Sequence, residues 1–153
     1  VEMRYVADSN ARVLGMKNGD FDAIASVPYN QAESLKSAAD IKLEEVPIFR
    51  LDYVYTNHKA KPLDSKDLRL ALNHAADREA IMKVVFFGYG TIPNSYMPKV
   101  NFHSDAVEPI PYDLEKAKAL VKSSGYKGQT LKLMVDAGNA PSKQIATILQ
   151  QGW

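Results

Sequence analysis

The chain has 153 residues, of which 46% are hydrophobic and 24% are charged, and its formal net charge is +1. This composition is ordinary for a globular domain with a substantial core, and so small a net charge gives no electrostatic reason to expect binding to nucleic acid or to an anionic membrane surface. The sequence has no cysteine, which excludes disulfides, thiolate metal ligands and a cysteine nucleophile.

The first part of the chain predicts a strand–helix–strand unit. Residues 3–6 are a short strand candidate, and polar side chains from Asp8 onward can cap a helix that stops at Gly19, because glycine permits the left-handed backbone of a helix end. Residues 21–27 are the next strand candidate. A further helix is predicted over residues 29–39.

Two more strands are predicted at residues 41–46 and 48–57. The second is the longest, and it places apolar side chains on one side and polar side chains on the other, which is typical of an antiparallel or mixed sheet. Its apolar side consists of Phe49, Leu51, Tyr53 and Tyr55.

The stretch 64–81 predicts two helices in tandem. Apolar residues recur at i, i+4 and i+7 in the first helix. Asp77 can cap the second helix by accepting a hydrogen bond from the backbone amide of Glu79 or Ala80. The residues that we expect to be deeply buried are Leu68, Leu72, Ala75 and Ile81.

The last third of the chain begins with a long, ordered surface loop over residues 89–111. A helix capped by Asp113 and ended by Gly125 follows, then a strand at 130–135 and a final helix over 142–153. Together these elements predict an α/β fold, a mixed sheet with flanking helices, in a single domain covering the whole chain.

Histidine, serine and glycine patterns give no support for catalysis or metal binding. His74 and Asp77 can share a helical face, but a metal or acid–base site needs a further ligand or nucleophile. We therefore interpret His74 as a helix-surface side chain and expect no metal held jointly by His58, His74 and His103. No nucleophile elbow or phosphate-binding loop is present either. The sequence predicts no enzyme activity and no cofactor.

The helical pair lies in a string that resembles a known family. The run KPLDSKDLRLALNHAADREAIMKVVFFGYG, together with PYDLEKAKALVKSSGY further on, resembles the extracellular solute-binding proteins that serve bacterial ABC importers of dipeptides, oligopeptides and nickel complexes. Asn57, which precedes the first run, also matches the family pattern. Within that run the matching residues are Pro62, Asp67, Arg69, Ala71, Leu72, Ala75, Asp77, Arg78 and Ile81.

This resemblance implies a location, partners and a fold. The family's proteins are periplasmic or are lipoproteins outside the cytoplasmic membrane, have two lobes of the type II-like kind that close on a ligand, and deliver a peptide or other small solute to membrane permease subunits. Here the motifs imply the first part of the C-terminal lobe, with the main ligand contacts of the family lying beyond Trp153. Ligand identity stays open among peptides, nickel chelates, haem, sugars and opines.

Candidate ligand-binding residues follow from the predicted strand ends, where ligands of open α/β sheets bind. One strand ends at Ser26, Pro28 and Tyr29, and the longest ends near Asn57. Tyr29 could also simply begin a helix, and Tyr53 and Tyr55 could be core residues. For Arg69, Asp77 and Arg78 we favour a structural role in capping and joining helices over ligand binding.

Two other kinds of protein fit part of this pattern. One is a small stand-alone α/β enzyme, and the other is a regulator in which a similar lobe senses a solute beside a DNA-binding domain. Because Val1 already lies next to a strand candidate and the last helix stops without a cap, we expect an excised piece of a longer protein. Such a piece would leave an unpaired sheet edge and is predicted to self-associate.

Overall fold

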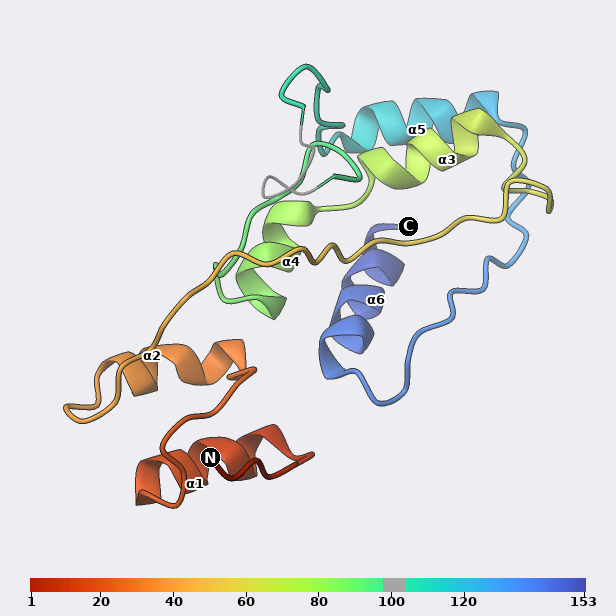
Figure 1. The fold of residues 1–153 in the computed structure, drawn as a ribbon. Coiled ribbons are helices and arrows are strands. Elements are labelled where there is room, and N and C mark those ends of the chain that lie inside the picture. Colours follow the sequence, from red (N-terminus) through yellow and green to blue (C-terminus); the bar gives the residue numbers. More distant parts are fainter. Residues whose placement is uncertain (98–103) are drawn as a thin grey trace. The chain divides into compact units, whose positions relative to one another are not determined.

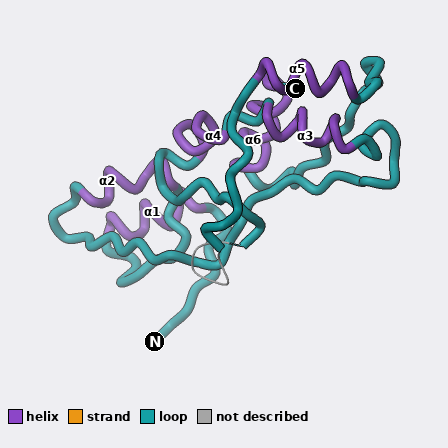
Figure 2. The backbone as a smooth tube through the Cα atoms, turned by 90° about the horizontal axis from the view of Figure 1, so that it is seen from above, coloured by secondary structure: helices purple, strands orange, loops and turns teal. Residues whose placement is uncertain are grey.

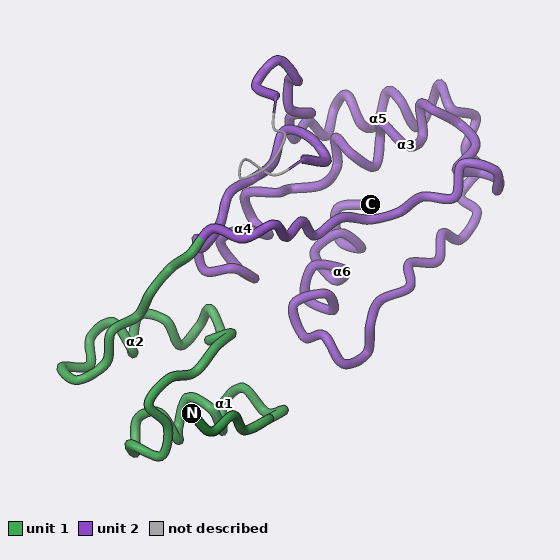
Figure 3. The backbone as a smooth tube through the Cα atoms, viewed as in Figure 1, with its two compact units in different colours: residues 1–46 green, residues 47–153 purple. Residues whose placement is uncertain are grey.

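A computed structural model describes residues 1–97 and 104–153 of the chain. Its contacts divide the chain into two compact units, Val1–Val46 and Pro47–Trp153, shown in different colours in Figure 3. The first unit contains α1 (Ser9–Asn18), the 3-10 turn η1 (Tyr29–Gln31) and α2 (Ala32–Lys36). The second contains the remaining helices, labelled in Figure 1: α3 (Lys66–His74), α4 (Arg78–Val85), α5 (Leu114–Ser123) and α6 (Ala140–Gly152).

The predicted mixed sheet is not confirmed. Residues 3–6, 21–27, 41–57 and 130–135 are loop in Figure 2, and no strand occurs in the part of the chain that the structure describes. A strand exists only through hydrogen bonds to a neighbour, and no backbone hydrogen bond within this part joins two of these segments. Their apolar side chains are correspondingly open to solvent, with Phe49 62% exposed and Met134 95% exposed.

Helix α1 forms as its sequence predicts. Asp8 accepts a hydrogen bond from the amide of Ala11 at 2.7 Å, and Gly19 ends the helix with φ at 78°. Gly15 lies so close to the ring of Phe21 that an added Cβ would be 2.4 Å from a ring carbon. The small side of α1 therefore packs directly against an aromatic ring in the first unit.

The helix predicted over residues 29–39 is shorter than expected. It starts as the 3-10 turn η1, continues as α2 and ends at Lys36. The reason is local: the Ser37 hydroxyl donates to the carbonyl of Glu33 at 3.0 Å, and turn hydrogen bonds then carry the chain to Ile41. Serine competes in this way with helical hydrogen bonding.

The tandem helices of the second unit are confirmed. Ser65 caps α3 through the amide of Leu68, and Asp77 caps α4 through the amide of Ala80 at 2.8 Å. Helix α5 lies beside α3 in both views, with the two running in opposite directions. Its amide at Asp113 donates to the carbonyl of His74, while the Ser123 hydroxyl at the other end donates to Asp67.

Burial of the helical pair is only partly as predicted. Leu68 is 1% exposed and Ala75 is 8% exposed, but Leu72 and Ile81 are half-buried, so the expectation of deep burial was wrong for those two residues. The buried stripe of α3 runs instead through Leu68, Ala71, His74 and Ala75, because this is the side that faces α5.

His74 corrects a second expectation. It is a buried residue, 4% exposed, and not a helix-surface side chain. Its Nδ1 atom is hydrogen bonded to the carbonyl of Pro111 at 2.8 Å, and a carbonyl is an acceptor, so Nδ1 carries the proton. The histidine thus joins α3 to the segment that leads into α5.

No helix within residues 1–97 and 104–153 is long and apolar enough to cross a membrane.

Candidate ligand-binding residues

Ser26, Pro28 and Tyr29 lie together at the end of the segment that leads to η1. Ser26 is exposed and has φ at 58°, a left-handed conformation that is uncommon for residues other than glycine. Pro28 accepts a hydrogen bond from the amide of Gln31 and begins the turn in which the half-buried Tyr29 lies. A strained residue followed by a fixed turn is a feature found often at binding sites.

Arg12 is a functional candidate that the sequence patterns did not identify. Its guanidinium donates to the carbonyls of Val6 at 2.7 Å and Ala7 at 3.2 Å, and also to the carbonyl of Ser26 at 3.1 Å. One side chain from α1 therefore holds together the ends of the two segments predicted as strands. An arginine one turn into the helix that follows a strand was the available signal, although such residues are usually exposed.

Asn57 belongs to the second unit, where it shapes a turn. Its side-chain oxygen accepts from the amide of Lys59 at 3.0 Å, and its carbonyl accepts from the amide of Ala60 at 3.2 Å. The side-chain amide group of Asn57 is exposed beside these bonds. A turn-forming role is thus established for Asn57, and it leaves two amide donors for a ligand.

Three tyrosines, Tyr53, Tyr55 and Tyr96, form a cluster, and Tyr55 lies two residues before Asn57 in the sequence. The rings of Tyr53 and Tyr55 meet edge to face with centroids 4.6 Å apart, and the Tyr96 ring lies 5.3 Å from that of Tyr53. All of them are exposed, by 47%, 77% and 62% respectively. Tyr53 and Tyr55 are therefore not core residues in this structure.

The hydroxyl groups of the tyrosine cluster are linked. The oxygens of Tyr53 and Tyr55 lie 2.7 Å apart. Hydrogen bonding to Tyr55, and secondly to Tyr96, raises the pKa of Tyr53 above the usual tyrosine range, and the hydrogen bond from Tyr53 lowers the pKa of Tyr55. Either hydroxyl can be the donor of this bond, because each phenol carries one proton and can also accept.

The polar residues of the family string have structural roles, as predicted. Arg69 donates to the carbonyls of Leu63 and Asp64 ahead of α3. Arg78 donates to the backbone and the side-chain oxygen of Asn73 and to the carbonyl of Ile110, and burial lowers its pKa. These charge-assisted bonds fix the loops around the helical pair.

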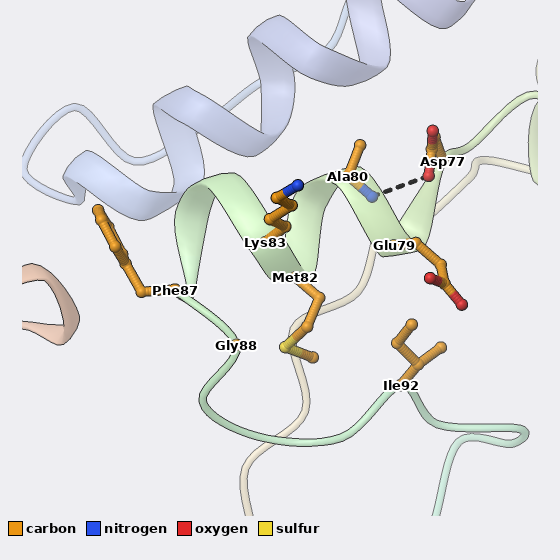
Figure 4. A pocket seen from close by; sticks show the side chains of 8 residues that line it. All are labelled: Asp77, Glu79, Ala80, Met82, Lys83, Phe87, Gly88 and Ile92. Atoms are coloured by element: carbon orange, nitrogen blue, oxygen red, sulfur yellow. Dashed lines mark hydrogen bonds between the residues drawn. The ribbon is translucent and has the colours of Figure 1, made fainter.

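Hollows in the described part of the second unit include the following two. One, of about 620 Å³, lies against α4 and is lined by Asp77, Glu79, Ala80, Met82, Lys83, Phe87, Gly88 and Ile92 (Figure 4). The other, of about 430 Å³, separates the turn before α3 from the segment after α5, and its lining includes Lys61, Asp64, Tyr126 and Lys127.

Metal binding receives no support from the described residues. Within residues 1–97 and 104–153 no group of three or more histidine, cysteine, aspartate or glutamate side chains could hold a metal ion. His58 is hydrogen bonded to the hydroxyl of Thr56 at 2.9 Å, and the Nδ1 atom of His74 is hydrogen bonded to the carbonyl of Pro111 at 2.8 Å. His103 lies outside the described residues, so the expectation for all these histidines together stays a prediction.

Comparison with known protein families identifies the family of the chain. The family described as "Bacterial extracellular solute-binding proteins, family 5 Middle" matches residues 1–153, which is every residue of the chain. This chain belongs to that family. The resemblance drawn from the two sequence strings is thereby confirmed. Family 5 proteins are described as extracellular and as binding proteins, which supports the predicted location and the prediction that the chain is not an enzyme.

Curated relatives of this family 5 chain include the glutathione-binding protein GsiB. The protein of Escherichia coli strain K12 is 32% identical over 152 residues, which cover 99% of the chain and 30% of the relative. The protein of Salmonella choleraesuis is 30% identical with the same coverage. The chain thus spans about 30% of the length of the curated relatives it matches.

Solved structures of similar proteins agree with the family. The structure of HbpA2 from Haemophilus parasuis matches with a TM-score of 0.74 and 28% identity, over 95% of the chain and 30% of that protein. The periplasmic binding protein DppA from Helicobacter pylori, in complex with the peptide STSA, matches with a TM-score of 0.71 and 26% identity, over 80% of the chain and 24% of that protein. The DppA structure is described as that of an ABC transporter-associated periplasmic binding protein.

Proposed function

We propose that the chain is part of the substrate-binding component of an ABC importer, which captures peptides or related small solutes outside the cytoplasmic membrane and passes them to permease subunits. Its membership of family 5 supports this proposal. The relative GsiB is named for binding glutathione, which is a tripeptide, and the DppA structure contains a bound peptide. Both relatives therefore point to peptide ligands. Peptide or peptide-like ligands are therefore the class to test first, in a periplasmic or lipoprotein setting.

The single structural observation that carries this proposal is the exposed tyrosine cluster, two of whose members precede Asn57 in the same segment. Tyrosine combines a flat apolar face with a hydroxyl group and loses little conformational entropy on binding, which suits a surface that accepts peptides of varied sequence. Linked hydroxyls of Tyr53 and Tyr55 can offer both a donor and an acceptor to a peptide backbone. The adjacent Asn57 supplies two further donors.

We propose separately, on observations within the first unit alone, that Ser26, Pro28 and Tyr29 are ligand contacts. The exposure of Ser26 and its left-handed backbone support a functional constraint. The Arg12 bonds to the ends of both neighbouring segments would hold this region rigid, and a pre-organised contact loses less free energy on binding.

The finer features of the predicted fold stay part of this proposal. In the full-length protein, we expect a mixed sheet with strands at 3–6, 21–27, 41–57 and 130–135. Its remaining strands would come from regions that correspond to the parts of the relatives outside the match. Their exposed apolar side chains support the idea, because such a surface is unstable in water unless covered. We retain the C-terminal lobe of a two-lobed protein as the proposed position of residues 1–153.

The test is a thermal-shift screen of the full-length protein against short peptides, glutathione and metal–chelate complexes. A ligand that binds only the native state raises the melting temperature by linkage. We expect a peptide-class hit, and we expect Asn57→Ala and Tyr29→Ala to weaken it by about tenfold or more, since each removes a polar contact. Tyr112→Ala, at an exposed tyrosine outside the proposed contacts, is the control. A hit from another class that is insensitive to Tyr29 and Asn57 would refute both the ligand class and the site.

A further inference from the structure

The hollow beside α4 is produced by the way that helix ends. Phe87, Gly88 and Gly90 have positive φ values of 54°, 83° and 110°, and the amide of Gly88 donates to the carbonyl of Met82 at 3.1 Å. These left-handed residues turn the chain back along the helix, so that Ile92 comes to face Met82 (Figure 4). Glycine at 88 and 90 makes the reversal possible without steric cost.

The lining of this hollow combines apolar and charged groups. Met82, Phe87 and Ile92 provide apolar surface, and Phe87 and Ile92 are 55% and 37% exposed. Glu79 and Lys83 bring opposite charges, and no ion pair between these two side chains occurs in the described part of the chain. Both charges are thus available to a ligand while the apolar surface lies beside them.

Asp77 adds a second carboxylate at the start of α4. One of its oxygens accepts the capping hydrogen bond from the Ala80 amide, so the cap holds the side chain in place while the other oxygen has capacity for a second donor. Negative charge therefore gathers at the first turn of the helix, on Asp77 and Glu79, and positive charge lies one turn later on Lys83.

We propose that this hollow binds a small zwitterion with an apolar side chain, such as a hydrophobic α-amino acid. Its ammonium group would pair with Glu79 and Asp77, its carboxylate with Lys83, and its side chain would pack on Met82 and Ile92. Residues four apart on a helix are about 5–6 Å apart at Cβ, a separation that a molecule with both charges can bridge. The volume lies within the range of small-molecule sites, about 300–1,000 Å³. This site is distinct from the tyrosine cluster.

Related compounds separate the contributions of each group. L-leucine carries both charges and an apolar side chain, N-acetyl-L-leucine lacks the ammonium, L-leucinamide lacks the carboxylate, and glycine lacks the side chain. We expect leucine to bind with a Kd of about 1 mM, as suits so small a ligand. Loss of either charge should weaken binding about tenfold, because charge-assisted hydrogen bonds are the stronger ones.

Methionine methyl groups provide a local readout in the 153-residue chain. With ¹³C-methyl methionine, leucine should shift the Met82 resonance saturably, while that of Met134, which is 95% exposed in another segment, should not move. Glu79→Gln and Lys83→Gln should each weaken the Met82 response about tenfold. Glu115→Gln, at an exposed carboxylate on α5, serves as the matched control.

Several outcomes would overturn the proposal. They are a Met82 resonance that does not respond to leucine, a response shared equally by Met134, or a response unchanged in Glu79→Gln and Lys83→Gln. A Met82 resonance that moves with protein concentration and not with leucine would show that another copy of the chain covers this surface. Because the readout is at Met82, failure here leaves the peptide-binding proposal for the full-length protein untouched.

Discussion

The indole Nε1 of Trp153 donates a hydrogen bond to the backbone carbonyl of Leu72 at 3.0 Å. This bond joins the end of α6 to the end of α3, and the backbone of Gly152 lies so close to Ala75 that an added Cβ would be 2.7 Å from its carbonyl oxygen. The sequence predicts a Trp153 that contacts another copy or folds back on a sheet. In the structure Trp153 folds back on helix α3 instead, and the residue is 40% exposed.

Trp153→Phe should destabilise the chain by about 0.5–1.5 kcal/mol, because the substitution removes one hydrogen bond and keeps most of the ring packing. Urea unfolding followed by circular dichroism measures the change, since Trp153 is the single tryptophan and its fluorescence is lost in the variant. Trp153→Ala is the comparison and should cost more. Equal stability of the wild type and Trp153→Phe would show that the bond contributes nothing.

Among the leucines of α3, substitution by alanine should reduce the stability of the chain most at Leu68. That side chain is 1% exposed, and Leu68→Ala is expected to cost about 2–5 kcal/mol through lost burial and a cavity. Leu72 is only half-buried, so the same change there should cost about half as much. Denaturant midpoints of the two variants give the comparison, and a larger loss at Leu72 would contradict the packing of α3 on α5.

Arg78→Lys should destabilise the second unit by about 1–3 kcal/mol, because a lysine ammonium lacks the planar fork whose two terminal nitrogens reach Asn73 and Ile110. The control is Arg50→Lys, where the side chain is exposed and forms only a 3.3 Å ion pair with Asp52; a change within about 0.5 kcal/mol is expected there. Thermal melts of both variants test this. Similar stability losses at the two positions would argue against the structural role of Arg78.

The tyrosine cluster should titrate unevenly at high pH. Hydrogen bonding raises the pKa of Tyr53 and lowers that of Tyr55, so Tyr55 should ionise first and Tyr53 should stay protonated longer. In Tyr55→Phe the main hydrogen-bond partner of Tyr53 is lost, and the pKa of Tyr53 should fall towards its ordinary value. The chain has eight tyrosines, so NMR of ¹³C-labelled tyrosine, with assigned ring resonances, is needed to follow Tyr53 and Tyr55 separately. A Tyr53 titration unchanged in Tyr55→Phe would show that the hydroxyls do not interact in solution.

Self-association of the 153-residue chain is expected, whereas a full-length family member should be a monomer. The unpaired segments expose apolar side chains, and association of two copies would cover them. Sedimentation velocity over a range of concentrations tests both proteins. Phe49→Ser and Met134→Ser, which remove exposed apolar surface, should weaken association. A chain that stays monomeric at high micromolar concentration would show that the exposed segments are harmless.

Local signals in the sequence were sufficient for most of the helices, although not for the length of the helix predicted over residues 29–39. Asp8, Asp77 and Asp113 cap helices where the sequence predicts them, because a cap depends on a side chain and an amide only a few residues away. The family was equally accessible, since two ordered strings of matching residues identify it without any geometry.

Only the tertiary structure decided the rest. A strand needs a partner, and the alternation of residues 48–57 cannot say whether one is present. It therefore left open whether Tyr53 and Tyr55 are core residues, and in the structure they form an exposed cluster. Helical periodicity likewise could not tell which side of α3 faces α5, and the answer buries His74 and leaves Leu72 half-exposed. Arg12 and Trp153 act through carbonyls far away in the sequence, and such contacts leave no local pattern because folding alone brings the two atoms together.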